Sequence, residues 1–222
     1  MQKAYTILYI HGMGGGGDSR IPSIMSEYFS GINVEHLSIR IEVICRTYSF
    51  DPEEAYAQIQ EWMCEFTPDM VIGESLGALH ALRLTTQPTL LISPALNASF
   101  YFEALAWMVL IPGVTRLFDR IYRPKEGDRQ QLHFTHKVLR KYLAHRRNAL
   151  SCHSVNSALS QPVHAFIGTC DHYRKSGIVS IRSWEKHFGN TYTLYDGSHF
   201  TEEEYIYSLI IPKVLELLIY NK

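Results

Sequence analysis

The chain has 222 residues, of which 46% are hydrophobic and 19% are charged, and its formal net charge is −1. This length and composition predict one α/β-sized domain with a substantial core, and they exclude a largely disordered chain. The near-neutral charge gives the chain as a whole no attraction to nucleic acid, so we expect no nucleic-acid partner.

The start of the sequence has one lysine and then an apolar run that is too short for an export signal. The longest uninterrupted apolar stretch, 104–111, has eight residues, far below the roughly 20 residues that span a bilayer. Four scattered cysteines without C-x-x-C spacing are typical of buried thiols in a reducing compartment. We therefore expect a cytoplasmic protein with no membrane span.

Short apolar runs alternate with helical patterns along the chain, which predicts a mostly parallel central sheet with helices on both faces. The runs are apolar almost throughout, as expected of strands that are covered on both sides. The six strand candidates are residues 4–10, 41–48, 69–73, 89–93, 163–168 and 191–195.

The first strand candidate leads into the glycine run "HGMGGGGDS", residues 11–19, ahead of a plausible helix. Gly12, Gly14 and Gly17 have the G-x-G-x-x-G spacing of a dinucleotide-binding turn. That interpretation needs an acid at the end of the second strand to hold the ribose, whereas this strand finishes with "RTY", residues 46–48. An NAD(P)-binding oxidoreductase is kept as an alternative.

One helix is expected before the third strand and another after it. Asp51 as a cap and Pro52 in the first turn predict a helix that runs to about Phe66. A second helix is predicted over 76–85, directly after the third strand.

The C-terminal segment has the pattern of one long apolar helix. Thr201 and Glu204 have the spacing of a capping box ahead of it. Pro212 should kink this helix or divide it.

Residues 97–155 contain no convincing strand, and they separate two parts with the alternating pattern, 1–96 and 156–222. We predict a helical cap or lid inserted into a single domain. The segment carries ten lysines and arginines against four aspartates and glutamates. It could be a solvated basic face, a lid that favours an acidic substrate, or a surface for a partner. Its apolar start, 100–111, could line an acyl pocket or pack the insertion onto the sheet.

The third strand candidate runs into "GESLG", residues 73–77, which fits the pattern G-x-S-x-G. Between a strand and a helix, this pattern predicts a tight turn that holds Ser75 in a strained conformation with its Oγ above the sheet. Glycines at both ends of the pattern would avoid collisions with the neighbouring strand and helix. Glu74 is expected to be a structural carboxylate beside the turn, and an inert serine in a glycine-rich turn is the alternative.

A serine nucleophile needs a base, and the base needs an acid that orients it. On this architecture the chain order is serine, acid, histidine. Asp171 follows the strand over 163–168, and His199 follows the last strand, so both belong to the carboxyl edge of the sheet. Asp196 is a rival for the acid, although it lies in a tight turn close to His199.

The remaining histidines form no H-x-x-x-H or H-E-x-x-H pair, so we expect no metal site. His164 lies within a strand and is expected to be a core or edge residue. The histidines on helical or basic stretches are expected mostly at the surface; they are residues 133, 136, 145, 153 and 187.

The segments "YIHGMGG", "GESLG", "GTCD" and "GSHF" together resemble the α/β-hydrolase superfamily over nearly the whole chain. The insertion falls where that superfamily commonly inserts a cap, and the compact size is similar to that of small bacterial esterases. The resemblance implies an α/β-hydrolase fold with Ser75 as nucleophile, Asp171 as acid and His199 as base. It further implies an oxyanion hole formed by the backbone N–H groups of Met13 and Leu76.

The resemblance therefore implies a serine hydrolase that cleaves a carboxylic ester or thioester of a small molecule through an acyl-enzyme. No cofactor is needed for this reaction, and the basic insertion leaves an anionic substrate as one option. A non-catalytic binding protein and the NAD(P)-dependent oxidoreductase are the alternatives. The resemblance does not specify the acyl group, the leaving group or the oligomeric state.

Overall fold

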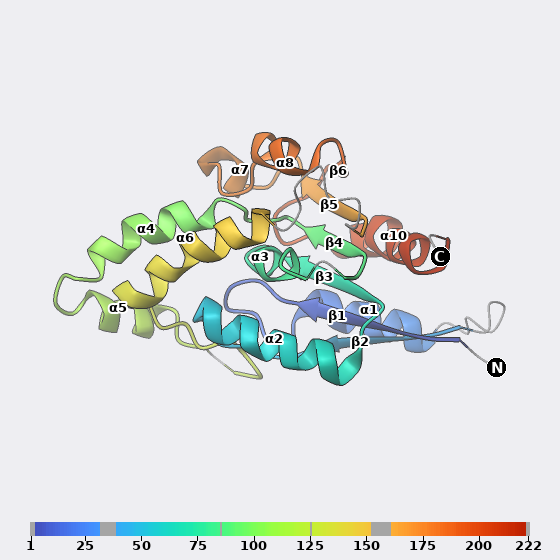
Figure 1. Cartoon of the computed structure of the whole chain (residues 1–222), viewed down its shortest axis with the longest axis horizontal. Helices are drawn as coiled ribbons and strands as arrows, with labels where there is room; N and C mark the ends of the chain where they lie inside the picture. The colour runs from blue at the N-terminus through green and yellow to red at the C-terminus, as the bar shows by residue number, and fades with distance from the viewer. Residues whose placement is uncertain (1–2, 32–38, 85, 125, 152–160, 221–222) are drawn as a thin grey trace.

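The computed structural model of the protein describes residues 3–31, 39–84, 86–124, 126–151 and 161–220 (Figure 1). Its strands form one sheet in the order β2-β1-β3-β4-β5-β6, and neighbouring strands are all parallel. They are β1 (Lys3–Ile10), β2 (Ile39–Cys45), β3 (Met70–Glu74), β4 (Thr89–Ile92), β5 (Val163–Gly168) and β6 (Tyr192–Tyr195). The predicted α/β class and its six strand candidates are confirmed, with ends that differ by a few residues.

Helices follow the strands and also fill the connection between β4 and β5. They are α1 (Arg20–Gly31), α2 (Pro52–Phe66), α3 (Gly77–Ala81), α4 (Ala98–Met108), α5 (Val114–Ile121), α6 (His136–Ser151), α7 (Tyr173–Ser176), α8 (Ile181–Phe188), α9 (Glu203–Tyr205) and α10 (Ile211–Leu215). Two π-helical segments, Ile206–Ile210 and Glu216–Tyr220, flank α10.

The sheet is covered on both faces because consecutive strand residues point to opposite sides. In β1, Leu8 and Ile10 join a core with α2, α3 and the helices of the insertion. Ile7 and Tyr9 join a second core with α1 and the C-terminal helical segments. All four side chains are fully buried, and burying a Leu or Ile stabilises the fold by about 1.5–3 kcal/mol relative to exposure.

The predicted helix start at Asp51 is confirmed, because its carboxylate accepts a 3.0 Å hydrogen bond from the N–H of Glu53 and α2 runs from Pro52. The helix predicted over 76–85 is shorter than expected. It ends at Ala81, and the N–H groups of Arg83 and Leu84 then bond to carbonyls three residues back, which tightens the chain into a turn. The predicted last residue of this helix lies outside the described ranges.

The capping box predicted at Thr201 is wrong. Thr201 is buried with a φ of +35°, and its hydroxyl shares a 2.7 Å hydrogen bond with that of Tyr195 instead of capping a helix. The cap position of α9 belongs to Glu202, which makes no side-chain capping bond. Pro212 divides the helical segment as predicted, since a π-helical stretch ends at Ile210 and α10 begins directly before the proline.

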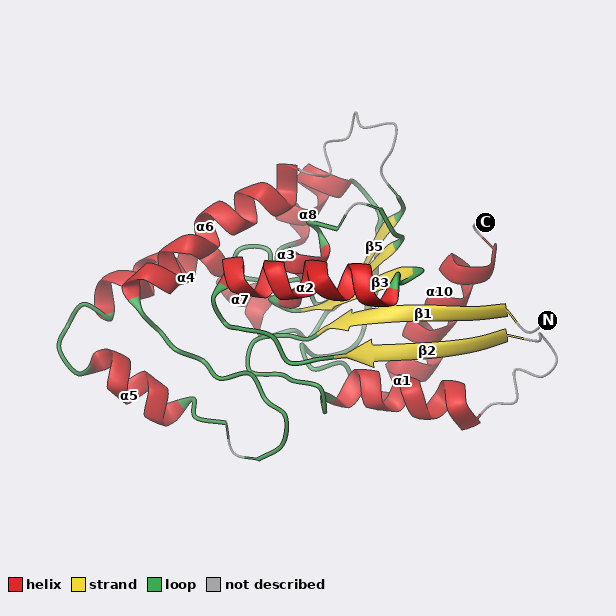
Figure 2. Cartoon of the chain, turned by 60° about the horizontal axis from the view of Figure 1, so that its bottom comes forward, coloured by secondary structure: helices red, strands yellow, loops and turns green. Residues whose placement is uncertain are grey.

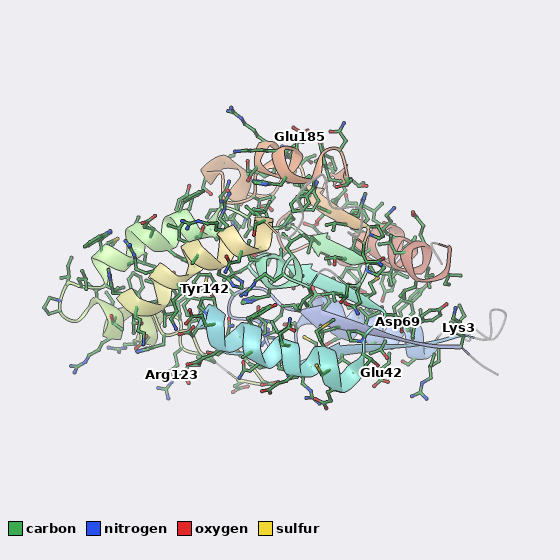
Figure 3. All side chains as sticks on the ribbon, in the orientation of Figure 1. Lys3, Glu42, Asp69, Arg123, Tyr142 and Glu185 are labelled. Atoms are coloured by element: carbon green, nitrogen blue, oxygen red, sulfur yellow. The ribbon has the colours of Figure 1, made fainter. Side chains whose placement is uncertain are left out.

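The described part of 97–155 forms α4, α5 and α6 and contains no strand. Helix α6 packs on α4 and also contacts α2 and α3 (Figure 2). Lys141 of α6 forms a 2.6 Å ion pair with Asp51 at the start of α2. Tyr142, labelled on α6 in Figure 3, donates a 2.7 Å hydrogen bond to the carbonyl of Phe50. These contacts anchor α6 of the insertion to the rest of the domain.

Two of the thiols predicted to be buried are exposed. Cys64 lies on the outer side of α2, whose buried residues are on the other face, and Cys170 lies in the loop after β5. Cys45 is half-buried at the end of β2. Within the described part of the chain, no helix has the length and hydrophobicity to cross a bilayer.

Candidate active site

Ser75 lies in the tight turn between β3 and α3, with a φ of +50° that L-residues rarely adopt. The glycines at both ends of this turn are required by close contacts. A Cβ at Gly73 would lie 2.7 Å from the Cβ of Ala81, and one at Gly77 would lie 2.4 Å from the carbonyl oxygen of His11. The predicted strained turn and the predicted purpose of its glycines are confirmed.

The turn presents Ser75 to His199, which lies in the loop after β6. The Oγ of Ser75 and the Nε2 of His199 are 2.9 Å apart. The Nδ1 of the same ring lies 2.7 Å from the Oδ2 of Asp171. With the proton on Nδ1, the ring donates to Asp171 and accepts from the serine hydroxyl. The structure thus joins residues from the ends of three strands into one hydrogen-bonded chain.

Asp171 is held in place by the backbone. Its second carboxylate oxygen accepts a 2.8 Å hydrogen bond from the N–H of Tyr173, and the carboxyl group is buried. The rival acid, Asp196, points elsewhere, because its exposed carboxylate accepts a 3.0 Å bond from the hydroxyl of Thr169. Only Asp171 therefore contacts His199 among the two acids that the sequence offered.

Met13 and Leu76, whose backbone N–H groups are the predicted oxyanion donors, both line the pocket at Ser75. A Cβ at Gly12 would lie 3.1 Å from the Cβ of Ser75, so the loop that carries Met13 passes directly over the serine. Among the described residues, neither N–H has a hydrogen-bond partner. Both N–H groups therefore remain available as hydrogen-bond donors.

The N–H groups of the glycine run are used within the protein. Gly14 donates to the side chain of Gln130, and Gly15 donates to the carbonyl of Gly12. Gly16 donates to the hydroxyl of Ser19, and Gly17 donates to that of Thr47. The distances are 3.0–3.1 Å. A pyrophosphate would need these donors for itself, so this geometry does not favour the dinucleotide interpretation.

The pocket at Ser75 has a volume of about 210 Å³. Its lining is largely apolar, and α4 contributes part of it. Besides the serine and histidine, the pocket is lined by Gly12, Met13, Glu74, Leu76, Ala95, Ala98, Tyr101, Phe102, Tyr173, Ile178 and Phe200. The apolar start of the insertion thus lines the pocket at Tyr101 and Phe102, and it also packs the insertion onto the core at Phe102 and Ala106.

Glu74 lies beside the turn, as predicted, and its carboxylate accepts a 2.7 Å hydrogen bond from the hydroxyl of Tyr9. Burial raises the pKa of Glu74, although the bond from Tyr9 acts in the opposite direction. Glu74 also borders a neighbouring hollow that contains Arg20 and Arg129. Arg129 is paired there with Asp18 at 2.8 Å.

Sequence reasoning missed a row of buried aromatic and histidine rings behind the glycine run. His11 stacks on Tyr48 at 4.2 Å, Tyr48 meets His80 at 5.2 Å, and His80 lies 4.3 Å from His145 of α6. The prediction that His145 lies at the surface is wrong, because this face of α6 packs against α3. Burial lowers the pKa of His11 to about 4 and that of His145 to about 3.

The described residues contain no group of three or more His, Cys, Asp or Glu side chains that could hold a metal ion. His164, expected in the core or at an edge, lies in β5 and shares a 3.0 Å hydrogen bond with Thr193 of β6.

No protein-family model matches the sequence, and no curated protein matches it. Solved structures match over nearly the whole chain. Est1E from Butyrivibrio proteoclasticus, with ferulic acid bound, has a TM-score of 0.61 at 15% identity, over 98% of this chain and 91% of that one. A carboxylesterase of the thaumarchaeon Nitrososphaera gargenis has a TM-score of 0.53 at 12% identity, over 98% and 92% of the two chains.

A thioesterase has the same fold. BorB, a type II thioesterase from the borrelidin biosynthetic cluster, matches with a TM-score of 0.54 at 17% identity, over 97% of this chain and 91% of that one. Together with the parallel six-stranded sheet, these similarities define the class: the chain has the α/β-hydrolase fold. At these identities the likeness concerns the fold, so the chemistry has to be argued from the site.

Proposed function

We propose that this protein is a serine hydrolase that cleaves a carboxylic ester or thioester of a small molecule. The observation that carries the proposal is the hydrogen-bonded chain from Ser75 through His199 to Asp171, with 2.9 Å and 2.7 Å between the paired atoms. An inert serine would need neither a strained backbone nor a buried histidine and carboxylate in this order.

In the first half of the reaction, the Oγ of Ser75 attacks the substrate carbonyl while the Nε2 of His199 takes the hydroxyl proton. Asp171 keeps the other ring proton on Nδ1 and stabilises the imidazolium. The tetrahedral intermediate then collapses as His199 returns the proton to the departing alcohol or thiol. The acyl group stays on Ser75.

In the second half, His199 takes a proton from water, and the hydroxide attacks the acyl carbon. The second intermediate releases the carboxylic acid as Ser75 regains its proton. Both intermediates place a negative oxygen where the N–H groups of Met13 and Leu76 would bind it. Loss of one such donor typically costs about 3–4 kcal/mol of transition-state stabilisation.

The lining of the pocket favours a compact, uncharged and apolar acyl group. Aromatic rings from Tyr101, Phe102 and Phe200 lie around Ser75. Two arginines lie in the neighbouring hollow: Arg129 is paired with Asp18, and Arg20 donates to the backbone carbonyl of Thr201. An anionic acyl group would meet the carboxylate of Glu74 in this pocket, and the residues that line it include no lysine or arginine.

Hydrolysis of p-nitrophenyl esters with acyl chains of increasing length tests the proposal. The wild type should turn over short-chain esters, and Ser75→Ala should lose this activity while keeping its fold. Ser26→Ala, which changes an exposed serine on α1, serves as the matched control and should remain active. Equal turnover by wild type and Ser75→Ala would contradict the proposal.

A further inference from the structure

The end of the insertion around α5 lies at the end of the molecule away from both termini (Figures 1 and 2), and it carries exposed apolar side chains. We define this cap tip as residues 107–123, which comprise the end of α4, the following turn and α5. Six of its apolar side chains are each more than half exposed, namely Trp107, Met108, Leu110, Ile111, Leu117 and Ile121. An exposed apolar patch of this kind marks an interaction site.

The helical period places the residues of α5 in three stripes along the helix: one packed against the core, one apolar and exposed, and one basic. Val114 and Phe118, one turn apart, pack against the core. Leu117 and Ile121 form an apolar stripe that faces solvent. None of the residues of α5 is fully buried, so packing within this chain accounts for only one side of the helix.

The third stripe of α5 is basic. Arg116 and Arg120 are exposed beside the apolar stripe, and Arg123 follows at the end of the tip. The side chain of Arg123, labelled in Figure 3, extends outward from the body of the protein. Within the described ranges, none of these three arginines has an ion-pair partner.

The tip offers almost no compensating negative charge. Asp119 is its single acidic residue, and His133 lies 2.9 Å from its carboxylate. The tip is thus apolar and basic on a chain whose formal net charge is only −1. Apolar side chains flanked by arginines are typical of helices that lie in the plane of an anionic membrane surface.

We propose that the cap tip docks on an anionic phospholipid surface, with the apolar side chains in the interface and the arginines among the headgroups. The shape of the tip supports this occupant. It projects at one end of the molecule (Figure 2), and a deformable lipid surface can enclose a projecting helix from several sides. A second copy of the chain would instead bring two sets of unpaired arginines together, which opposes a dimer through the tip.

This proposal concerns binding alone and does not depend on the proposed hydrolase activity. Sedimentation with vesicles tests it directly, using phosphatidylcholine vesicles with and without phosphatidylglycerol. The wild type should bind the mixed vesicles and not those of phosphatidylcholine alone, and salt should weaken the binding. Arg116→Gln with Arg120→Gln should reduce partitioning about 30-fold, and Leu117→Ser with Ile121→Ser should reduce it about tenfold or more.

Matched variants separate the tip from the rest of the surface. Two control variants change exposed residues outside the tip: Arg40→Gln with Arg182→Gln matches the arginine variant, and Leu194→Ser matches the apolar one. Both should bind as the wild type does. Circular dichroism spectra should be unchanged in all variants because the altered side chains are exposed.

The proposal fails if the wild type does not sediment with the mixed vesicles, if it binds both kinds of vesicle equally, or if the tip variants bind like the wild type. It also fails if sedimentation velocity shows a dimer that Leu117→Ser with Ile121→Ser dissociates, because the tip would then be an interface between copies.

Discussion

The N–H of Gly14 donates a 3.1 Å hydrogen bond to the side-chain oxygen of Gln130, which comes from the connection between α5 and α6. The same glutamine donates its own backbone N–H to the carbonyl of Gly15 and its side-chain amide to the carbonyl of Tyr48. One buried residue of the insertion therefore holds the loop that carries Met13 over Ser75. Four consecutive glycines would otherwise leave this loop free to move.

Replacing Gln130 with alanine should therefore lower kcat of the proposed hydrolase about tenfold with little change in KM. The loop would lose its anchor, and a small displacement of the Met13 N–H weakens its interaction with the transition state. Ester hydrolysis kinetics measure the effect, and Gln131→Ala, at an exposed neighbouring position, is the control. Wild-type kinetics for Gln130→Ala would show that the loop holds its position without this anchor.

Gly16→Ala should destabilise the protein by about 2–4 kcal/mol, because the added Cβ would meet the carbonyl oxygen of Asp128 at 1.6 Å and the backbone must move. Gly113→Ala is the matched comparison. It has a φ of +89° and open space around the new Cβ, so it should cost only about 1–2 kcal/mol of backbone strain. Urea denaturation measures both, and equal losses would contradict the assigned contact.

Asp171→Asn should lower kcat by about 10⁴-fold, since an amide in this position favours the wrong tautomer of His199. Asp196→Asn should leave kcat within about twofold of the wild type, because its carboxylate bonds to Thr169 and does not touch the histidine. Steady-state kinetics on the same p-nitrophenyl ester decide between the two acids. A larger loss for Asp196→Asn would identify it as the orienting acid.

The buried His145 should make stability depend on pH. Burial lowers its pKa from 6.5 to about 3, so the unfolded chain binds a proton below about pH 6.5 that the folded protein excludes. The stabilisation is complete above that pH and falls as the pH decreases, by about 2 kcal/mol at pH 5.

His145→Gln removes this titration. Between about pH 7 and pH 5, its free energy of unfolding should fall by about 2 kcal/mol less than that of the wild type. His172→Gln, at an exposed position in the loop after β5, is the control and should resemble the wild type. Parallel pH profiles for wild type and His145→Gln would show that this ring is accessible to protons in the fold.

Much of the fold was predictable because its signals are local. Apolar runs of strand length and the G-x-S-x-G pattern can each be recognised within a few residues of sequence, although the contact that requires Gly77 is with the distant His11. The chain order of Ser75, Asp171 and His199 was also predictable, since strands of a parallel sheet end at the same edge. The sequence favoured Asp171 over Asp196 as the acid but left Asp196 as a rival, because the contact with His199 depends on how two loops leave neighbouring strands.

The errors came from side-chain contacts that the local sequence patterns do not show. His145 lies in a basic stretch, yet the face of α6 that carries it packs on α3. Thr201 has the right spacing for a cap, yet its hydroxyl forms a hydrogen bond with that of Tyr195. The role of Gln130 in anchoring the glycine loop left no local pattern, since 116 residues separate it from Gly14.

The most direct test of the proposed activity is the intact mass of the protein after treatment with a fluorophosphonate, which reacts with an activated serine. We predict one adduct per chain on the wild type, its absence in Ser75→Ala, and much slower labelling of His199→Ala. A wild-type protein that gains no mass, or a Ser75→Ala variant that gains the same adduct, would contradict the assignment of Ser75 as the nucleophile.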